Sequence, residues 1–150
     1  RIVSLDEAVG VVNSGDRLYF HAGAATPHVL IDGLVELRPG LRDVEIVHLH
    51  TDGPAPYTDP SMEGRFRHNA LFIGPNTRQA VQEGRADYTP VFLSEIPSLF
   101  EPGGSLPLDV AFIHVTPPDS AGNCSLGVSV DCALAAAKHA RIVLAQVNPR

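Results

Sequence analysis

Cysteine is nearly absent from this 150-residue sequence, and so is any long apolar run. The two cysteines, Cys124 and Cys132, are too few for a disulfide framework and too isolated for a zinc site. No stretch reaches the roughly 18–20 apolar residues that a membrane-spanning helix needs, and no charged-then-apolar leader is present. We therefore expect no membrane association and, by default, a cytoplasmic location. The chain begins at Arg1 rather than methionine, so we expect both ends to be cuts within a longer protein.

Positive charge is scarce as well. The sequence has 11 lysines and arginines against 17 aspartates and glutamates, a net charge of −6. A surface that binds duplex nucleic acid needs a basic stripe, so the charge balance argues against this class of partner. Four arginines (Arg65, Arg67, Arg78 and Arg85) do gather in one stretch, either to meet an anionic ligand or to solvate one face. The remaining composition, 44% hydrophobic and 19% charged, is ordinary for one soluble globular domain.

Strand and helix patterns alternate along the chain with short connections. Short apolar runs predict six strands, over residues 17–20, 44–49, 68–73, 87–93, 109–115 and 141–147. One helix is opened by a capping box of Ser4 and Glu7 and ends near Asn13; another starts with Thr26 as its cap, and a third covers 129–139. This alternation predicts an α/β fold, with a mainly parallel sheet of about six strands flanked by helices.

Parallel sheets present functional groups in the loops that follow their strands. Phe20-His-Ala-Gly-Ala-Ala-Thr-Pro27 combines a strand end, a small-residue turn and a helix start, which can offer free N–H groups to an anion or simply pack tightly. It is neither a dinucleotide fingerprint nor a P-loop, because the glycine spacing and the Gly-Lys pair are absent. His21, beside this turn, is either a functional residue or a core histidine. The long loop over 50–67 is a second candidate segment.

A pair of histidines raises the question of a metal. His48 and His50, with Asp52 next, form an H-x-H pattern whose two side chains are expected on one face of a strand. A third converging ligand would make a zinc site, whereas a half-buried strand histidine otherwise hydrogen-bonds a neighbour. The sequence leaves both readings open.

The nucleophile candidates are weak. Gly127-Val-Ser-Val-Asp131 is similar to a nucleophile elbow but ends in Asp, so Ser129 and Asp131 fit better as helix-start residues. No positive neighbour is evident that would make Cys124 a thiolate. Glu63 and Glu95 are expected to be structural or surface carboxylates. The residues alone therefore supply no complete catalytic set.

Three longer motifs carry a family resemblance. They are Gly64-Arg-Phe-Arg-His-Asn-Ala-Leu-Phe-Ile-Gly-Pro-Asn76, Ala80-Val-Gln-Glu-Gly-Arg-Ala-Asp-Tyr-Thr-Pro-Val-Phe-Leu-Ser-Glu-Ile-Pro97, and Pro117-Pro-Asp-Ser-Ala-Gly-Asn-Cys-Ser-Leu-Gly-Val-Ser-Val-Asp131 with Val147-Asn-Pro149. The chain resembles the acetyl-CoA hydrolase/transferase family over nearly its whole length, but only that family's amino-terminal domain. Within the family it is most similar to the 4-hydroxybutyrate (butyrate/acetate-type) CoA-transferases.

The resemblance implies one CoA-transferase-like domain over residues 1–150, with a second, catalytic domain absent from this chain. Enzymes of the family move coenzyme A between short-chain carboxylic acids through a glutamyl-CoA thioester. The nucleophilic glutamate belongs to the second domain, beyond residue 150, so none of Glu63, Glu83 and Glu95 is assigned that role. We expect the chain alone to be an inactive part of an enzyme.

The resemblance also implies that this half walls an acyl pocket at the interface between the two domains. The matched positions expected to bind substrate are His21, Gly23, Ala24, Asp52, Pro54, Tyr57, Asn76, Ser94 and Glu95. Coenzyme A or acyl-CoA is expected as substrate, with no metal and no covalently bound cofactor. The expected partners are acyl-CoA and a carboxylic acid, the protein's own C-terminal domain, and further copies of itself in a homo-oligomer.

Three other functions remain open at this point. The first is an acetyl-CoA hydrolase of the same family, since hydrolase and transferase differ in water exclusion. The second is a non-catalytic domain that binds acyl-CoA or a sugar phosphate. The third is a metal-dependent hydrolase that would use His48, His50 and Asp52.

Overall fold

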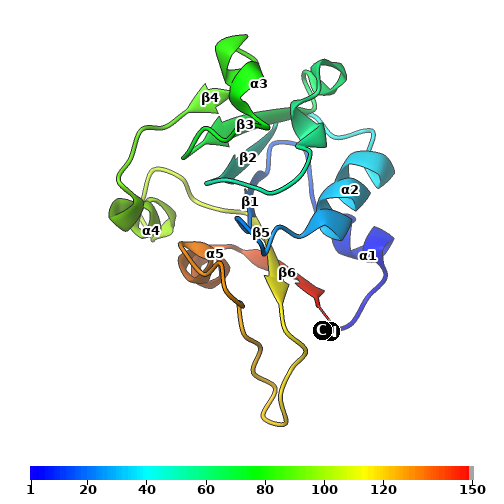
Figure 1. Ribbon diagram of the computed structural model, residues 1–150. Coiled ribbons are helices and arrows are strands. Elements are labelled where there is room, and N and C mark those ends of the chain that lie inside the picture. Colours follow the sequence, from blue (N-terminus) through cyan, green and yellow to red (C-terminus); the bar gives the residue numbers. More distant parts are fainter. Residues whose placement is uncertain (149–150) are drawn as a thin grey trace.

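The six strands form one parallel sheet in the computed structural model, which describes residues 1–148. Their spatial order is β4-β3-β2-β1-β5-β6, and every neighbouring pair is parallel (Figure 1). The strands are β1 (Arg17–Phe20), β2 (Val44–His48), β3 (Phe66–Ala70), β4 (Asp87–Tyr88), β5 (Val110–Val115) and β6 (Ile142–Val147). The predicted fold class is confirmed.

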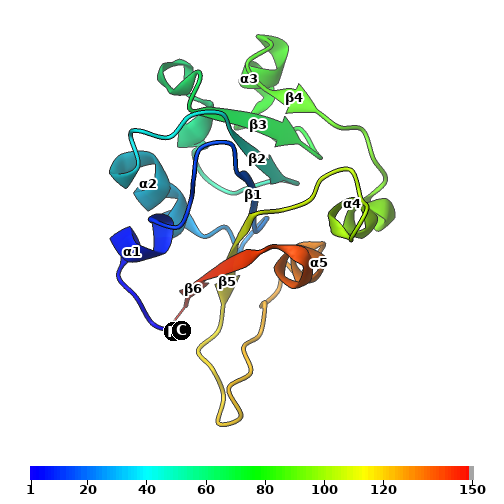
Figure 2. The same cartoon turned by 180° about the vertical axis from the view of Figure 1, so that it is seen from behind.

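Helices cover both faces of the sheet (Figure 2). One face packs against α1 (Leu5–Val9), α2 (His28–Leu37) and the short 3₁₀ turn η1 (Pro56–Thr58). The opposite face packs against α4 (Ile96–Phe100) and α5 (Ala133–His139). The remaining elements are α3 (Arg78–Gln82) and the 3₁₀ turns η2 (Pro60–Met62) and η3 (Leu93–Glu95).

The two apolar cores follow from alternation along the central strands. Leu18 and Phe20 of β1 point toward α2, whereas Tyr19 between them points toward α4 and α5; all three are fully buried. Successive side chains of a strand face opposite ways, so a strand covered on both sides must be apolar at every position. The apolar stretches at residues 18–20 of β1 and 110–113 of β5 fit this arrangement.

Several boundaries differ from those predicted. The run at 87–93 pairs with β3 only at Asp87 and Tyr88, because Pro90 has no N–H to continue the ladder. The helix predicted from 129 begins at Ala133, and α1 ends at Val9 rather than near Asn13. The Ser4 hydroxyl accepts from the Glu7 N–H at 3.2 Å, which confirms the predicted N-cap.

Thr26 is not the cap of α2. Its side chain makes no capping hydrogen bond; its hydroxyl donates to the Gly23 carbonyl and accepts from the Asp52 N–H. The residue therefore joins the loop after β1 to the loop after β2. This correction matters for the site described below.

The connection between β5 and α5 projects from the body of the molecule as a long excursion over residues 116–131 (Figure 1). Within residues 1–148, no helix is long and apolar enough to cross a membrane. The predicted loop entry after β6 includes Pro149, which lies outside the described residues.

Candidate functional site

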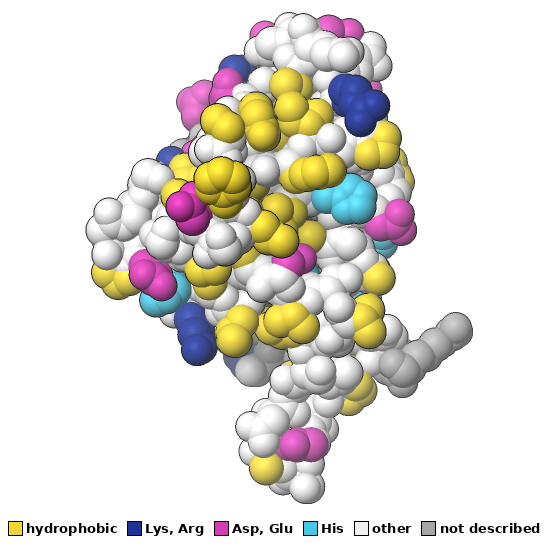
Figure 3. All heavy atoms as spheres, turned by 60° about the vertical axis from the view of Figure 1, so that its left-hand side comes forward, with side chains coloured by type: hydrophobic (Ala, Val, Ile, Leu, Met, Phe, Trp, Pro, Cys, Tyr) yellow, Lys and Arg dark blue, Asp and Glu magenta, His cyan; other side chains and the backbone are white. Residues whose placement is uncertain are grey.

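A mainly apolar hollow of about 600 Å³ opens at the carboxyl ends of the strands. Its walls come from segments far apart in sequence: the loops after β1, β2 and β3, the start of α4, and residues 128–131 before α5. The apolar side chains that line it are Ala22, Leu49, Leu71, Phe72, Val91, Leu93, Ile96, Val128 and Val130. Figure 3 shows hydrophobic side chains gathered over this face of the molecule. A concave apolar site with few polar groups is the usual setting for a small organic ligand.

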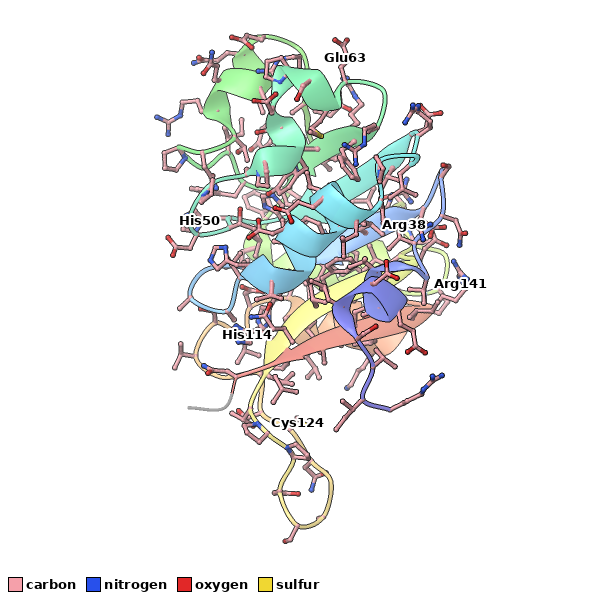
Figure 4. The ribbon with its side chains drawn as sticks, turned by 90° about the vertical axis from the view of Figure 1, so that its right-hand side faces the viewer. Arg38, His50, Glu63, His114, Cys124 and Arg141 are labelled. Atoms are coloured by element: carbon pink, nitrogen blue, oxygen red, sulfur yellow. The ribbon has the colours of Figure 1, made fainter. Side chains whose placement is uncertain are left out.

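Among residues 1–148, three polar or charged side chains line this hollow: His50, Ser129 and Asp131. His50 follows β2 and lies against the Phe72 ring, with the ring centres 6.0 Å apart. Figure 4 shows His50 and His114 on one side of the ribbon and Arg38 and Arg141 on the opposite side. The strand ends at which the hollow opens thus lie on the side of the molecule opposite Arg38 and Arg141.

The two histidines of the H-x-H pair lie in different environments. His48 is buried within the α2-side core, where its Nε2 lies 2.6 Å from the Tyr57 hydroxyl and its ring stacks on His68. Burial, followed by the nearby His68, holds the His48 pKa well below its usual value. His50 instead faces the hollow, so the expectation that both lie on one face is wrong. Residues 1–148 contain no group of three side chains placed to hold a metal ion.

His21 is fully buried, and both of its ring nitrogens are engaged. Its Nε2 lies 2.6 Å from the Ser129 carbonyl, and its Nδ1 accepts from the His114 N–H at 3.2 Å. A carbonyl can only accept, so the proton sits on Nε2 and Nδ1 is the acceptor. His21 therefore fastens the loop after β1 to the segment before α5.

The N–H groups of the small-residue turn are not free for an anion. Gly23 donates to the His50 carbonyl at 2.7 Å, and Ala24 donates to the Ser129 hydroxyl at 3.1 Å. Gly23 has φ of +57°, and a Cβ there would lie 2.9 Å from the Ser129 hydroxyl oxygen. A side chain at this position would be strained and would collide, so glycine is required. The turn is a closely packed junction, and Gly23 itself lines the hollow.

Asp52, Pro54 and Tyr57 lie in the loop after β2, and Asn76, from the loop after β3, supports it. Asn76 donates to the Thr51 and Gly53 carbonyls, and the buried Tyr57 hydroxyl bonds His48 beneath them. Asp52 and Pro54 are exposed on the same loop. These residues support or border the site but do not line the hollow itself.

The other predicted residues lie at its margins. Ser94 and Glu95 are exposed in η3, between Leu93 and Ile96, which both line the hollow. Ala24 lines a smaller neighbouring hollow of about 220 Å³, which shares Val128 with the larger one. The predicted substrate-binding roles of all nine residues remain predictions.

The four clustered arginines do not converge on an anion site. Arg67 pairs with Asp87 through two hydrogen bonds of 2.5 and 2.6 Å, and Arg85 pairs with Glu83. Arg65 donates to the carbonyls of Val35 and Arg38. Three of the guanidinium groups are thus committed within the fold, and Arg78 is exposed.

Neither cysteine is an activated nucleophile in this structure. Burial raises the pKa of the Cys132 thiol to about 12. Cys124 is exposed on the projecting 116–131 segment, away from the hollow (Figure 4). Asp131 next to Cys132 accepts from the Cys132 and Ala133 N–H groups and from the Tyr19 hydroxyl. It is a helix-start residue as predicted, with its carboxylate at the edge of the hollow.

Sequence reasoning missed most of the residues that form the hollow. The sequence patterns indicated Ser129 as a weak nucleophile candidate or a helix-start residue, and they indicated no site role for the apolar residues Phe72, Val128 and Val130. A usable signal existed, because Val128 and Val130 are apolar residues in a polar, glycine-containing loop. Exposed apolar residues of this kind mark binding surfaces.

Comparison with known proteins decides the family. Residues 1–150 match the acetyl-CoA hydrolase/transferase N-terminal domain. The chain belongs to the acetyl-CoA hydrolase/transferase family. The resemblance inferred from the three sequence motifs is thereby confirmed.

Two curated relatives within the family are CoA transferases. A succinyl-CoA:acetate/propanoyl-CoA:succinate CoA transferase of Fasciola hepatica is 51% identical over 95% of this chain and 30% of its own length. A 4-hydroxybutyrate coenzyme A transferase of Clostridium kluyveri is 44% identical over 99% of this chain and 34% of its own length. The chain therefore spans about a third of the length of the curated relatives it matches.

Solved structures share the fold. The 4-hydroxybutyrate CoA-transferase of Porphyromonas gingivalis has a TM-score of 0.78 and 32% identity, covering 99% of this chain and 33% of that one. RipA of Yersinia pestis has a TM-score of 0.86 and 24% identity, covering 97% and 36%. At that identity, the RipA likeness shows the fold alone.

Proposed function

We propose that this domain is the N-terminal part of a CoA-transferase that moves coenzyme A between short-chain carboxylic acids of the 4-hydroxybutyrate, butyrate and acetate type. The observation that carries the proposal is the 51% and 44% identity to two CoA transferases over nearly the whole chain. The apolar hollow at the strand ends has the character that a short acyl chain requires.

The proposed reaction passes through covalent intermediates on a glutamate of the C-terminal domain. The glutamate carboxylate attacks the acyl-CoA carbonyl and displaces the CoA thiolate, which leaves an acyl-glutamyl anhydride. The thiolate then attacks the glutamyl carbonyl, forms a glutamyl-CoA thioester and releases the first acid. A second acid reverses these steps and leaves as its CoA ester. Covalent catalysis of this kind divides one difficult exchange into easier steps.

The role proposed for this domain is to wall the acyl pocket at the interface with that C-terminal domain. Seven of the nine predicted binding residues lie in the loops after β1, β2 and β3. These loops follow the strand ends at which the hollow opens. We expect these residues to shape the pocket and to exclude water while the glutamyl intermediates exist.

The test uses the full-length protein and butyryl-CoA, with acetate as acceptor. Intact-mass measurement after incubation with butyryl-CoA should show a CoA adduct on one glutamate, and acetate should be converted to acetyl-CoA. Release of CoA and butyrate without any acceptor would instead establish the hydrolase. If neither the adduct nor turnover is detected, the proposal is contradicted, and the domain is a binding domain. The 150-residue chain assayed alone should show no exchange.

A further inference from the structure

Ser129 occupies a distinctive position in the hollow. Its hydroxyl oxygen accepts from the Ala24 N–H at 3.1 Å, and its carbonyl lies 2.6 Å from His21 Nε2. These contacts join residues more than 100 positions apart in sequence and hold Ser129 from two directions. The side chain is therefore oriented by the fold.

The hydroxyl proton of Ser129 is uncommitted. A serine hydroxyl can donate one hydrogen bond as well as accept. Its oxygen is used as an acceptor by Ala24, and no acceptor for its proton is found among residues 1–148. Ser129 lines the hollow beside Gly23, which has no side chain to cover it. A ligand in the hollow thus meets an oriented donor among mainly apolar side chains.

The neighbouring polar groups restrict what that donor can bind. The Asp131 carboxylate also lines the hollow and cannot donate, and its Oδ1 is already taken by two N–H groups and the Tyr19 hydroxyl. Its negative charge disfavours an anion and favours a neutral acceptor near Ser129. A thioester carbonyl is such an acceptor, and a short alkyl chain attached to it would contact Phe72, Val128 and Val130.

We propose that Ser129 is a substrate-positioning residue whose hydroxyl donates to the acyl oxygen of a short-chain acyl group bound in the hollow. This inference rests on the proposed function, because it takes the acyl-CoA as the ligand. The Ala24 and His21 contacts orient the donor before the ligand arrives, so little orientational freedom is lost on binding.

The test compares two unreactive ligands on the full-length protein. S-(2-oxopentyl)-CoA carries a ketone oxygen, and S-pentyl-CoA lacks it; both are measured as competitive inhibitors. The variant Ser129→Ala should weaken binding of S-(2-oxopentyl)-CoA about tenfold, which is the value of one well-formed hydrogen bond. The same variant should weaken binding of S-pentyl-CoA less than about twofold. Butyrate is measured in parallel. Weaker binding of butyrate, with binding of the ketone unchanged, would contradict the assignment of a neutral thioester oxygen as the acceptor.

Thr26→Val is the matched control. Thr26 braces the same turn through Gly23 and Asp52 but does not line the hollow. The Thr26→Val variant should change the affinities for S-(2-oxopentyl)-CoA and S-pentyl-CoA by the same factor. If Ser129→Ala also weakened both CoA ligands equally, Ser129 would be only a structural brace, and the inference would be overturned.

A second variant tests the inference if Ser129→Ala does not fold. Ser129→Cys preserves the volume but offers only a weak donor, so it should reproduce the selective loss of ketone binding if Ser129→Ala unfolds. A wild-type protein that exchanges CoA, yet shows no oxygen-dependent loss in either variant, would refute the role of Ser129 alone. A wild-type protein that binds neither CoA ligand would refute the proposed function itself.

Discussion

At the scale of single residues, buried histidines should make the stability of this domain depend on pH. His48 and His68 stack with ring centres 4.1 Å apart inside the α2-side core. His68 Nδ1 lies 2.9 Å from the Ile46 carbonyl, so it donates there, and its Nε2 has no partner among residues 1–148. These rings occupy the core as neutral groups, which makes them a source of acid sensitivity.

Stability should therefore fall below neutral pH. Burial lowers the pKa of His68 to about 4, against an ordinary value near 6.5. The unfolded chain then binds a proton more readily than the folded one, so the free energy of unfolding decreases as pH falls from about 6.5 to about 4. The loss should reach about 2 kcal/mol by pH 5 from this residue alone.

Urea denaturation between pH 7.5 and pH 5 measures this dependence. In His68→Gln, the free energy of unfolding should depend less steeply on pH. In His139→Gln, at an exposed position at the end of α5, the dependence should be unchanged. An equally steep profile in His68→Gln would show that other groups cause the acid loss.

At the scale of an element, the start of α5 depends on one carboxylate. Asp131 Oδ1 accepts from the N–H groups of Cys132 and Ala133, and its own φ is +29°. Asp and Asn tolerate positive φ better than other residues with a side chain. The predicted helix from 129 therefore starts later, because residues 129–131 are held against the turn after β1 and are unavailable to α5.

Replacing this carboxylate should destabilise the domain. Asp131→Ala removes the acceptor of two N–H groups and should lower the free energy of unfolding by about 1 kcal/mol. Asp131→Asn keeps an acceptor oxygen and should retain most of that stability. Thermal unfolding of both variants provides the comparison, and equal losses would show that the charge, rather than the hydrogen bonds, matters.

At the scale of the whole molecule, β6 forms one edge of the sheet, and one of its own faces is exposed. Its Ile142 and Leu144 pack inward, but Val143 and Val147 are 40% and 50% exposed, and Leu134 of α5 is 48% exposed. Residues 142–147 contain neither proline nor a charge. An unprotected, apolar edge strand is a template for pairing with another chain.

The 150-residue chain should consequently self-associate in solution. Light scattering across a concentration series should give a mass above that of the monomer, and Val143→Lys should lower it by placing a charge on the exposed face. Leu37→Lys, on the opposite side of the sheet, serves as control. A monomeric mass at every concentration would contradict this prediction.

The sequence by itself determined the fold class and the family. The apolar stretches at residues 18–20 and 110–113 indicate strands covered on both faces, and Ser4 caps α1 as its pattern predicts. The motifs around Gly64–Asn76 and Pro117–Asp131 carry the family resemblance. These signals are local, so they can be read without knowing what packs against what.

The tertiary structure alone decided how the site is built. His48 and His50 are two residues apart, yet one is buried and the other faces the hollow, because β2 ends between them. The sequence left open whether the turn after β1 offers free N–H groups or packs tightly, and the Ser129 hydroxyl, 105 residues away, accepts the N–H of Ala24. Burial and hydrogen-bond partners are properties of contacts between distant segments, and no local pattern encodes them.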